Sequence, residues 1–169
     1  MIKKNQIVNF KVGREQFGVP VESVHEIVRV SEITPVPEMP LFVEGIINLR
    51  GRIVTVISLS KRMKIEGSVR TKSSRILIVE VDGMVIGLMV DAVMEILRLP
   101  EEMIERAPDL ASDIGAEYIS GVGKLPDRLI ILIDLQRILR ASEMGRLHQS
   151  QLSPHFIAES PPASEKEAA

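Results

Sequence analysis

The 169-residue sequence contains no cysteine and no tryptophan. The absence of cysteine excludes disulfides, thiolate metal sites and cysteine nucleophiles. Three histidines are present, and only His25 lies outside the polar C-terminal segment, so a zinc site would depend on carboxylates and a Ser-His-Asp triad on His25 alone. Aromatic residues make up 3% of the chain, too few for a surface that stacks nucleic-acid bases. These absences weaken the case for an enzyme and for a cofactor or metal site.

Long apolar runs and an excess of either charge are also missing. The longest apolar run, Leu129–Ile133, is far too short to cross a membrane. Residues Met1–Gln6 lack the apolar core of a signal peptide, which predicts a cytoplasmic protein. Residues 142–169 hold two of the 21 basic and four of the 23 acidic residues, so the rest carries 19 of each. A neutral body does not attract a phosphate backbone, and we expect neither nucleic-acid binding nor membrane insertion.

The composition divides the chain into one domain and a tail. Residues 1–141 are long enough to bury a core, and 45% of the whole sequence is hydrophobic. Ser, Pro, Ala, Glu and Gln dominate from residue 142 onward. That composition cannot offset the entropy cost of ordering, so we expect 142–169 to be disordered. A passive tail is favoured over a docking peptide on composition alone.

The apolar residues of the domain follow the period of strands. Short β-branched and leucine-rich runs recur, and Asp82-Gly83 between two of them predicts a hairpin turn. Helical signals are short: about one turn at 40–45, another at 100–106, and a helix over 134–141 capped by Asp134. The predicted fold class is all-β with short helices.

An internal duplication is the most informative pattern. Residues 17–29 (FGVPVESVHEIVR) recur as 86–98 (IGLMVDAVMEILR), and 42–59 recur less closely as 118–135. The spacing is 69 residues in the first match and 76 in the second, which indicates a loop insertion. Matching Gly, Glu and Arg residues favour duplication over chance similarity between strands. We therefore expect two similar barrels that face each other across a seam.

The C-terminal part of segment 17–29, and that of its repeat 86–98, carries residues suited to partner contact. The two copies would present to the seam Val24, Glu26 and Ile27 from one side and Val93, Glu95 and Ile96 from the other. Each set places a carboxylate among apolar residues, which is costly if the acid is buried without a partner. The alternative is that Glu26 and Glu95 simply face water, and composition alone favours it.

Catalytic and charged motifs fail or stay ambiguous. Gly121–Lys124 lacks the Ser or Thr and the glycine spacing of a phosphate loop. Three acids, Asp109, Asp113 and Glu117, are expected to be solvated surface because Gly115 interrupts any helical face. The basic stretch 61–75 is predicted to be a solvated connection between strands, with an acidic partner as the minority interpretation.

The segment Asn48–Gly51 (NLRG) is more specific. It lies between the expected one-turn helix and a strand, so Gly51 would supply a turn with positive φ and Asn48 a local backbone bond. The second copy has Lys124–Asp127 (KLPD) in its place, so Arg50 is not needed to build the barrel. Arg50 would then be free to act outward on a partner.

At these residues the sequence resembles a known family. The stretch 42–59 (FVEGIINLRGRIVTVISL) looks like the hallmark of CheW, the chemotaxis coupling protein family, and the match extends in order over roughly 5–141. The resemblance implies two five-stranded SH3-like barrels, interleaved along the chain and packed around a hydrophobic core. Two positions depart from the family pattern: Thr55 replaces a common Pro and Ser58 a common Asp.

The resemblance also implies a function. CheW-like proteins are non-catalytic adaptors that link the cytoplasmic tips of chemoreceptors to the regulatory domain of a CheA-type histidine kinase. Alternatives are a divergent paralogue serving pili or second-messenger control, or a small-ligand regulator that uses the groove between the barrels. The residues at positions tied to receptor or kinase binding are Val24, Glu26, Ile27, Gly45, Asn48, Arg50, Val93 and Ile96. Gly45 is expected to act on backbone geometry at a helix end.

Overall fold

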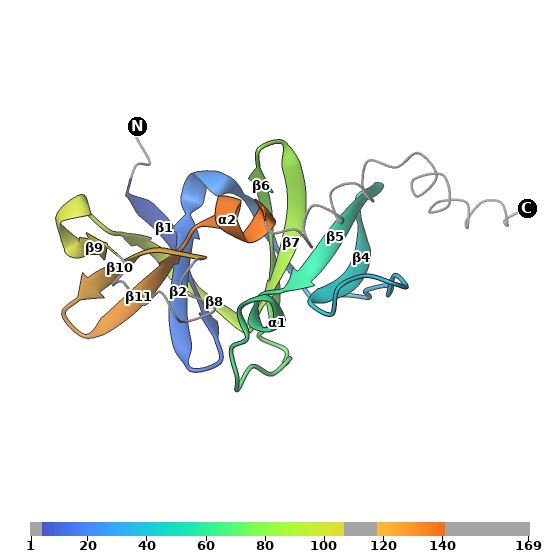
Figure 1. The fold of residues 1–169 in the computed structure, drawn as a ribbon, viewed down its shortest axis with the longest axis horizontal. Coiled ribbons are helices and arrows are strands. Elements are labelled where there is room, and N and C mark those ends of the chain that lie inside the picture. The colour runs from blue at the N-terminus through green and yellow to red at the C-terminus, as the bar shows by residue number, and fades with distance from the viewer. Residues whose placement is uncertain (1–4, 107–117, 141–169) are drawn as a thin grey trace, which may run out of the picture.

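The computed structural model describes residues 5–106 and 118–140, which form two β-sheets side by side with two short helices at their junction (Figure 1). One sheet has the strand order β8-β1-β2-β11-β10-β9 and the other β3-β6-β7-β5-β4. The strands are β1 (Gln6–Val12), β2 (Glu15–Pro20), β3 (Val24–Arg29), β4 (Val43–Leu49), β5 (Arg52–Ser58), β6 (Arg75–Val81), β7 (Met84–Val90), β8 (Ala92–Arg98), β9 (Ile104–Arg106), β10 (Ile119–Leu125) and β11 (Arg128–Ile133). The prediction of an all-β fold with short helices is confirmed.

The two sequence repeats exchange their first hairpins. The β1–β2 hairpin of the first repeat lies in the sheet that contains β8, β10 and β11 of the second. The β6–β7 hairpin of the second repeat lies between β3 and β5 of the first. Parallel pairs join the exchanged hairpins to their hosts, β2 with β11 and β7 with β5. Each sheet is therefore built from both copies, and neither copy could form its sheet alone.

The tight turns follow from residues that accept positive φ. Asp82 and Gly83 lie at φ 52° and 80° between paired Val81 and Met84, which makes the predicted two-residue hairpin between β6 and β7. Arg50 and Gly51, at φ 53° and 85°, form the equivalent turn between β4 and β5.

The helices differ in part from expectation. The six-residue α2 (Leu135–Arg140) begins where predicted, and the Arg137 backbone N–H donates to Asp134 Oδ1 at 3.2 Å. At 40–45 the one-turn helix is wrong, because Leu41 and Phe42 form a turn and β4 begins at Val43. At 100–106 a 3₁₀ turn (Glu101–Met103) leads directly into β9. The helix α1 (Leu59–Met63) was not expected, and Ser58 caps it by accepting from Lys61 N–H.

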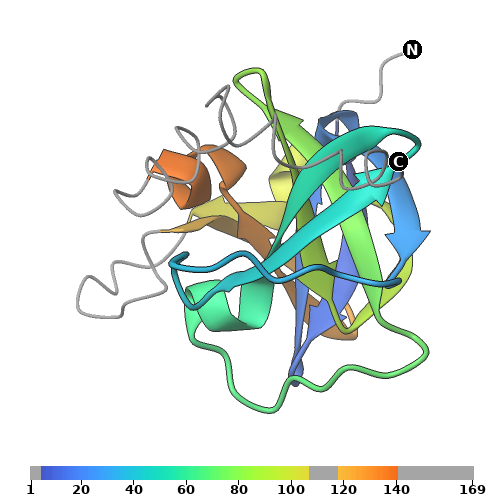
Figure 2. The same ribbon diagram turned by 90° about the vertical axis from the view of Figure 1, so that its right-hand side faces the viewer.

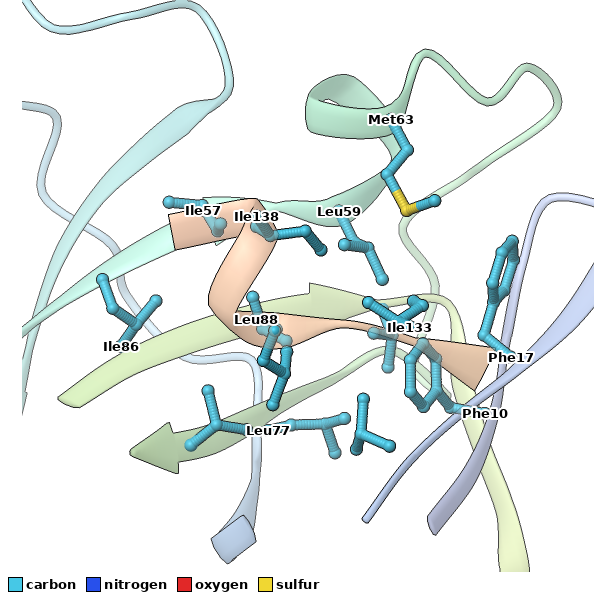
Figure 3. Packing of buried hydrophobic residues seen from close by; sticks show 14 of the residues in the cluster. Phe10, Phe17, Ile57, Leu59, Met63, Leu77, Ile86, Leu88, Ile133 and Ile138 are labelled. Carbon is cyan, nitrogen blue, oxygen red and sulfur yellow. The ribbon is translucent and has the colours of Figure 1, made fainter. Parts of the chain in front are cut away.

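The core has three parts. A central cluster between the sheets contains Phe10 and Phe17 from one side and Leu77 and Leu88 from the other, with Ile138 of α2 (Figure 3). A second cluster, around Ile76 and Ile78, lies within the curved sheet formed by β3 to β7. A third cluster, around Leu99 and Ile130, lies within the other sheet. Burial on both faces explains why β6 and β7 are nearly continuous apolar runs.

The sheets differ by one strand. Two five-stranded sheets were expected, and one has the additional short β9, paired with β10. In the other sheet the corresponding edge makes a single bridge, Thr34 with Ile46. The long connection from α1 to β6 runs below the strands in Figure 2. No helix within the described ranges is long and apolar enough to span a membrane. The predicted tail 142–169 and the acids Asp109, Asp113 and Glu117 lie outside the described residues.

Candidate functional site

An ion pair joins two of the predicted site residues. Arg50, on the tip of the β4–β5 hairpin, donates from Nη2 to Oε2 of Glu26 on β3. The Arg50 side chain is 69% exposed and that of Glu26 31%. Strands β3 and β4 are opposite edges of one sheet, so this contact requires the sheet to curl until its edges approach. Arg50 is therefore accessible, and its Nη2 group is paired within the chain.

The hairpin that carries Arg50 is fixed by its neighbours. The Gly51 backbone N–H donates to Asn48 Oδ1 at 2.7 Å, and Gly51 lies at φ 85°. The backbone roles predicted for Asn48 and Gly51 are confirmed, although two strands rather than a helix and a strand flank the turn. Because Arg50 itself lies at positive φ, the turn and the Asn48 amide together set the direction of its side chain.

Gly45 is a buried backbone position rather than a contact surface. It lies at φ 144° in β4, next to a shift in the β4–β5 register. A Cβ at this position would lie 2.2 Å from the Thr34 carbonyl oxygen. The predicted backbone role is therefore supported, but in a strand and not at a helix end. Gly45 shapes the edge of the sheet that leads to the Arg50 turn.

A similar ion pair occupies the other sheet. Arg128, the first residue of β11, donates from Nη2 to Oε2 of Glu95 on β8 at 2.6 Å. Glu95 is the duplication partner of Glu26, and the two strands share an irregularity, at His25 in β3 and at Met94 in β8. Arg128 was missed because it matches Arg52 in the sequence repeat, whereas the residue that matches Arg50 is Pro126.

The two predicted sets do not form one site. Val24 and Val93 both pack against the central cluster, so these two do face the junction of the sheets. Glu26 and Glu95, however, each pair with an arginine of their own sheet. Both sheets also expose apolar side chains: Ile27 and Ile53 in one, Met94, Ile96 and Leu129 in the other. The arrangement is two similar surfaces, one for each sheet, in place of a single shared seam.

The interiors behind the two ion pairs differ. Asn9 on β1 is fully buried, donates from Nδ2 to Gln16 Oε1 at 3.1 Å, and pairs in register with Glu95. The equivalent partner of Glu26 is the apolar Ile78. A polar pair thus underlies one surface, and an apolar cluster underlies the other. Asn9 was not among the predicted residues, although an asparagine within an apolar strand is a readable signal.

The basic stretch 61–75 is not simply solvated. Glu44, on β4 and mostly buried, faces Lys61 Nζ at 3.0 Å and Arg70 Nη2 at 3.9 Å. The Arg62 side chain is buried against the rings of Phe42 and Tyr118. The prediction for this stretch holds for its exposed residues and is wrong for Arg62, which lies on the inward side of α1.

Two pockets are lined by charged and polar side chains. One of about 410 Å³ lies between the sheets and is lined by residues that include Glu80, Asp82 and Asp134. Another of about 360 Å³ is lined by Glu44, Lys61, Arg70 and several serines. His25 pairs with Glu80 at 2.8 Å on the surface. Across residues 5–106 and 118–140 no cluster of three or more potential metal ligands occurs.

Comparison with known proteins adds independent findings. The model of the family described as "CheW-like domain" matches residues 6–143. The chain is 33% identical to "Chemotaxis protein CheW" of Klebsiella aerogenes over 80% of this chain and 82% of that protein. It is 31% identical to the protein of the same name from Thermotoga maritima, over 82% and 89%. The solved structure of the scaffolding protein TtCheW from Thermoanaerobacter tengcongensis superposes with a TM-score of 0.76, at 41% identity over 82% of this chain and 90% of the other.

Proposed function

Because the chain belongs to the family of CheW-like domains, we propose that it is a non-catalytic adaptor of chemotaxis signalling that couples chemoreceptors to a CheA-type histidine kinase. The coarser part of this function, a scaffold of the chemotaxis machinery, rests on the family match over residues 6–143. The finer part is the choice of partners: the cytoplasmic receptor tip and the regulatory domain of the kinase. The adaptor would work in the cytoplasm, held at receptor arrays through these partners.

The observation that carries the proposal is the accessible ion pair of Glu26 and Arg50, in a sheet that also exposes Ile27 and Ile53. The sheet thus presents an accessible ion pair on a fixed turn and two exposed apolar side chains on its strands. Protein interfaces favour this composition, in which apolar contacts supply affinity and charges supply orientation. Arg50 offers a planar fork of donors, of which the Nη2 group is in contact with Glu26.

The two surfaces provide for two partners at once. Each sheet presents a Glu–Arg pair with exposed apolar neighbours, and the two surfaces lie on different sheets. An adaptor must bind two proteins without competition between them, and separate surfaces meet that requirement. Val24 and Val93, at the junction of the sheets, would support a helical receptor tip that lies along it.

The testing experiment is a titration of the full chain with the isolated regulatory domain of a CheA-type kinase from the same source, followed by addition of a receptor tip. Saturable binding of the kinase domain and recruitment of the tip to the complex are the expected results. Arg50→Ala and Glu26→Ala should weaken at least one of the two interactions, whereas Arg29→Ala, an exposed arginine at the end of the same strand β3, should weaken neither.

One outcome would contradict the function, and another would contradict only the location of the binding surface. If neither partner binds the wild-type chain, the adaptor function is wrong, and the groove-ligand alternative would be tested by a search for small molecules that raise the melting temperature. If both partners bind but Arg50→Ala, Glu26→Ala and Arg29→Ala all bind equally well, the function stands and the surface is misplaced.

A further inference from the structure

A buried arginine bridges the two sheets at their junction. The guanidinium carbon of Arg62 lies 4.9 Å from the centre of the Phe42 ring and 4.7 Å from the centre of the Tyr118 ring. Arg62 is 7% exposed, and both rings are buried in the central cluster. Phe42 and Arg62 flank strands of one sheet, while Tyr118 immediately precedes β10 of the other. We refer to these three residues as the arginine bridge.

The two rings occupy equivalent places in the duplicated fold. Phe42 and Tyr118 are matched residues of the sequence repeat. The Phe42 carbonyl accepts from Ser58 N–H at 2.7 Å, and the Tyr118 carbonyl accepts from Asp134 N–H at 2.8 Å, so the same backbone bond anchors each ring. Ser58 and Asp134 in turn cap α1 and α2. Arg62 therefore contacts both halves of the fold at matching points.

The residue that matches Arg62 in the second copy is Ile138 of α2, which is fully buried in the same central cluster. An aliphatic side chain thus meets the packing requirement at the equivalent position. Arg62 instead buries a charge, and its Nε and Nη2 atoms have no hydrogen-bond partner within the described part of the chain. Burial of such a group costs free energy that the cation–π contacts offset only in part.

A cation kept at a cost suggests a role in orientation rather than in stability. Contact with a ring face is directional, because the guanidinium must lie over the ring, whereas the hydrophobic effect that drives aliphatic burial has no preferred direction. We propose that the arginine bridge fixes the orientation of one sheet relative to the other, and that this fixed orientation is what lets the adaptor hold both partners productively. The second half of this proposal rests on the proposed function, since it assigns one partner surface to each sheet.

The orientation can be measured on the protein by itself. The chain has no native cysteine, so Lys11→Cys on β1 and Arg29→Cys on β3 place one nitroxide label on each sheet at exposed positions. Pulsed electron resonance then gives the distribution of the distance between the labels. We expect a narrow distribution in the otherwise unchanged chain and a broader one in Arg62→Met, with a melting temperature that is equal or higher. Broadening without loss of stability is a result that a purely structural role would not give.

Matched variants separate orientation from packing. Ile138→Val truncates the equivalent buried residue, so it should lower the melting temperature and leave the distribution narrow. Tyr118→Leu should broaden the distribution as Arg62→Met does, and Tyr118→Phe, which keeps the ring, should not. These tyrosine variants keep the test decisive if Arg62→Met does not fold. A narrow distribution in both Arg62→Met and Tyr118→Leu would overturn the proposal.

The coupling half is tested with kinase domain and receptor tip. Arg62→Met should bind each partner alone within about two-fold of wild type. Receptor-dependent stimulation of the kinase through the three-protein complex should fall about ten-fold, a typical size for coupling between sites. Full stimulation despite a broadened distribution would overturn this half. If wild type binds neither partner, the proposed function fails, while the label distances still decide whether the bridge orients the sheets.

Discussion

Each sheet contains a Glu–Arg ion pair, but the arginine comes from a different structural element in each. In one, Glu26 pairs with an arginine on a hairpin tip; in the other, Glu95 pairs with an arginine at the start of a strand. The Arg50 side chain is 69% exposed and that of Arg128 28%. A turn residue projects into solvent, whereas the first residue of a strand lies along the sheet. Duplication has therefore preserved the acid and its pairing, while the source of the arginine and its accessibility have diverged.

The turns explain this divergence. Pro126 restricts φ to about −65°, so the second copy cannot form the turn with two positive φ values that Arg50 and Gly51 make. A change of turn type moves the donor from the loop to the strand. The comparison teaches that a matched carboxylate is a better guide to an equivalent surface than a matched arginine. The comparison also predicts that the two ion pairs respond differently to the same substitution.

The largest effect is expected at the glycines of β4 and β10. Gly45→Ala should lower the free energy of unfolding by about 4 kcal/mol, because the new Cβ would lie 2.2 Å from the Thr34 carbonyl oxygen at a φ of 144°. Gly121→Ala, with its closest contact at 2.8 Å, should cost less. Gly51→Ala is the control for positive φ alone and should cost about 1 kcal/mol. Urea unfolding measures all three, and equal losses at Gly45 and Gly51 would show that the steric contact is unimportant.

Charge reversal should have different effects on the Glu26–Arg50 and Glu95–Arg128 ion pairs. Arg50→Glu should weaken partner binding by about 1–3 kcal/mol with little change in stability, because the side chain is exposed. Arg128→Glu should instead reduce stability by about 1–3 kcal/mol, because its Nε is buried and Glu95 would face a like charge. Calorimetric titration and thermal unfolding provide the two readouts. Equal losses of stability in the two variants would contradict the expected difference between the two ion pairs.

Exchange of the charges sharpens the role of Arg50. The double variant Glu26→Arg/Arg50→Glu keeps an intramolecular pair, so its stability should stay within about 0.5 kcal/mol of wild type. If a partner reads the individual charges, its binding stays weak by about 1–2 kcal/mol. Recovery of binding in the double variant would mean that the pair only shapes the surface.

The smallest effect is expected in the interior. Replacement of the Asn9–Gln16 pair by the residues at the equivalent positions, as Asn9→Ile/Gln16→Val, should change the free energy of unfolding by less than about 1 kcal/mol, in the stabilising direction. The reason is that Asn9 Oδ1 is buried and has no hydrogen-bond partner among the residues that the structure describes, and removal of both polar groups ends that cost. A single Asn9→Ile should be worse than the double variant, because Gln16 then loses its donor. A large loss in the double variant would show that the polar pair supports the Glu95 surface.

Local signals in the sequence were sufficient for much of the fold. Alternating apolar residues and Asp82-Gly83 predicted strands and a hairpin, and Asp134 predicted the start of α2. The repeat predicted that Glu26 and Glu95 are equivalent. The prediction of a one-turn helix at 40–45 was wrong. Pro40 and Gly45 suggest a helix locally, whereas pairing with β5 places Val43–Leu49 in a strand.

The sequence by itself determined the class of fold, the turn chemistry of Asn48–Gly51 and the absence of thiol chemistry, since these depend on local backbone preference and composition. Only the tertiary structure decided that the repeats exchange hairpins, that Arg50 binds Glu26, and that Arg62 meets Phe42 and Tyr118. Each of these joins segments far apart in the chain. Strand order and side-chain pairing depend on how the sheets curl and pack together, and no local pattern encodes that geometry.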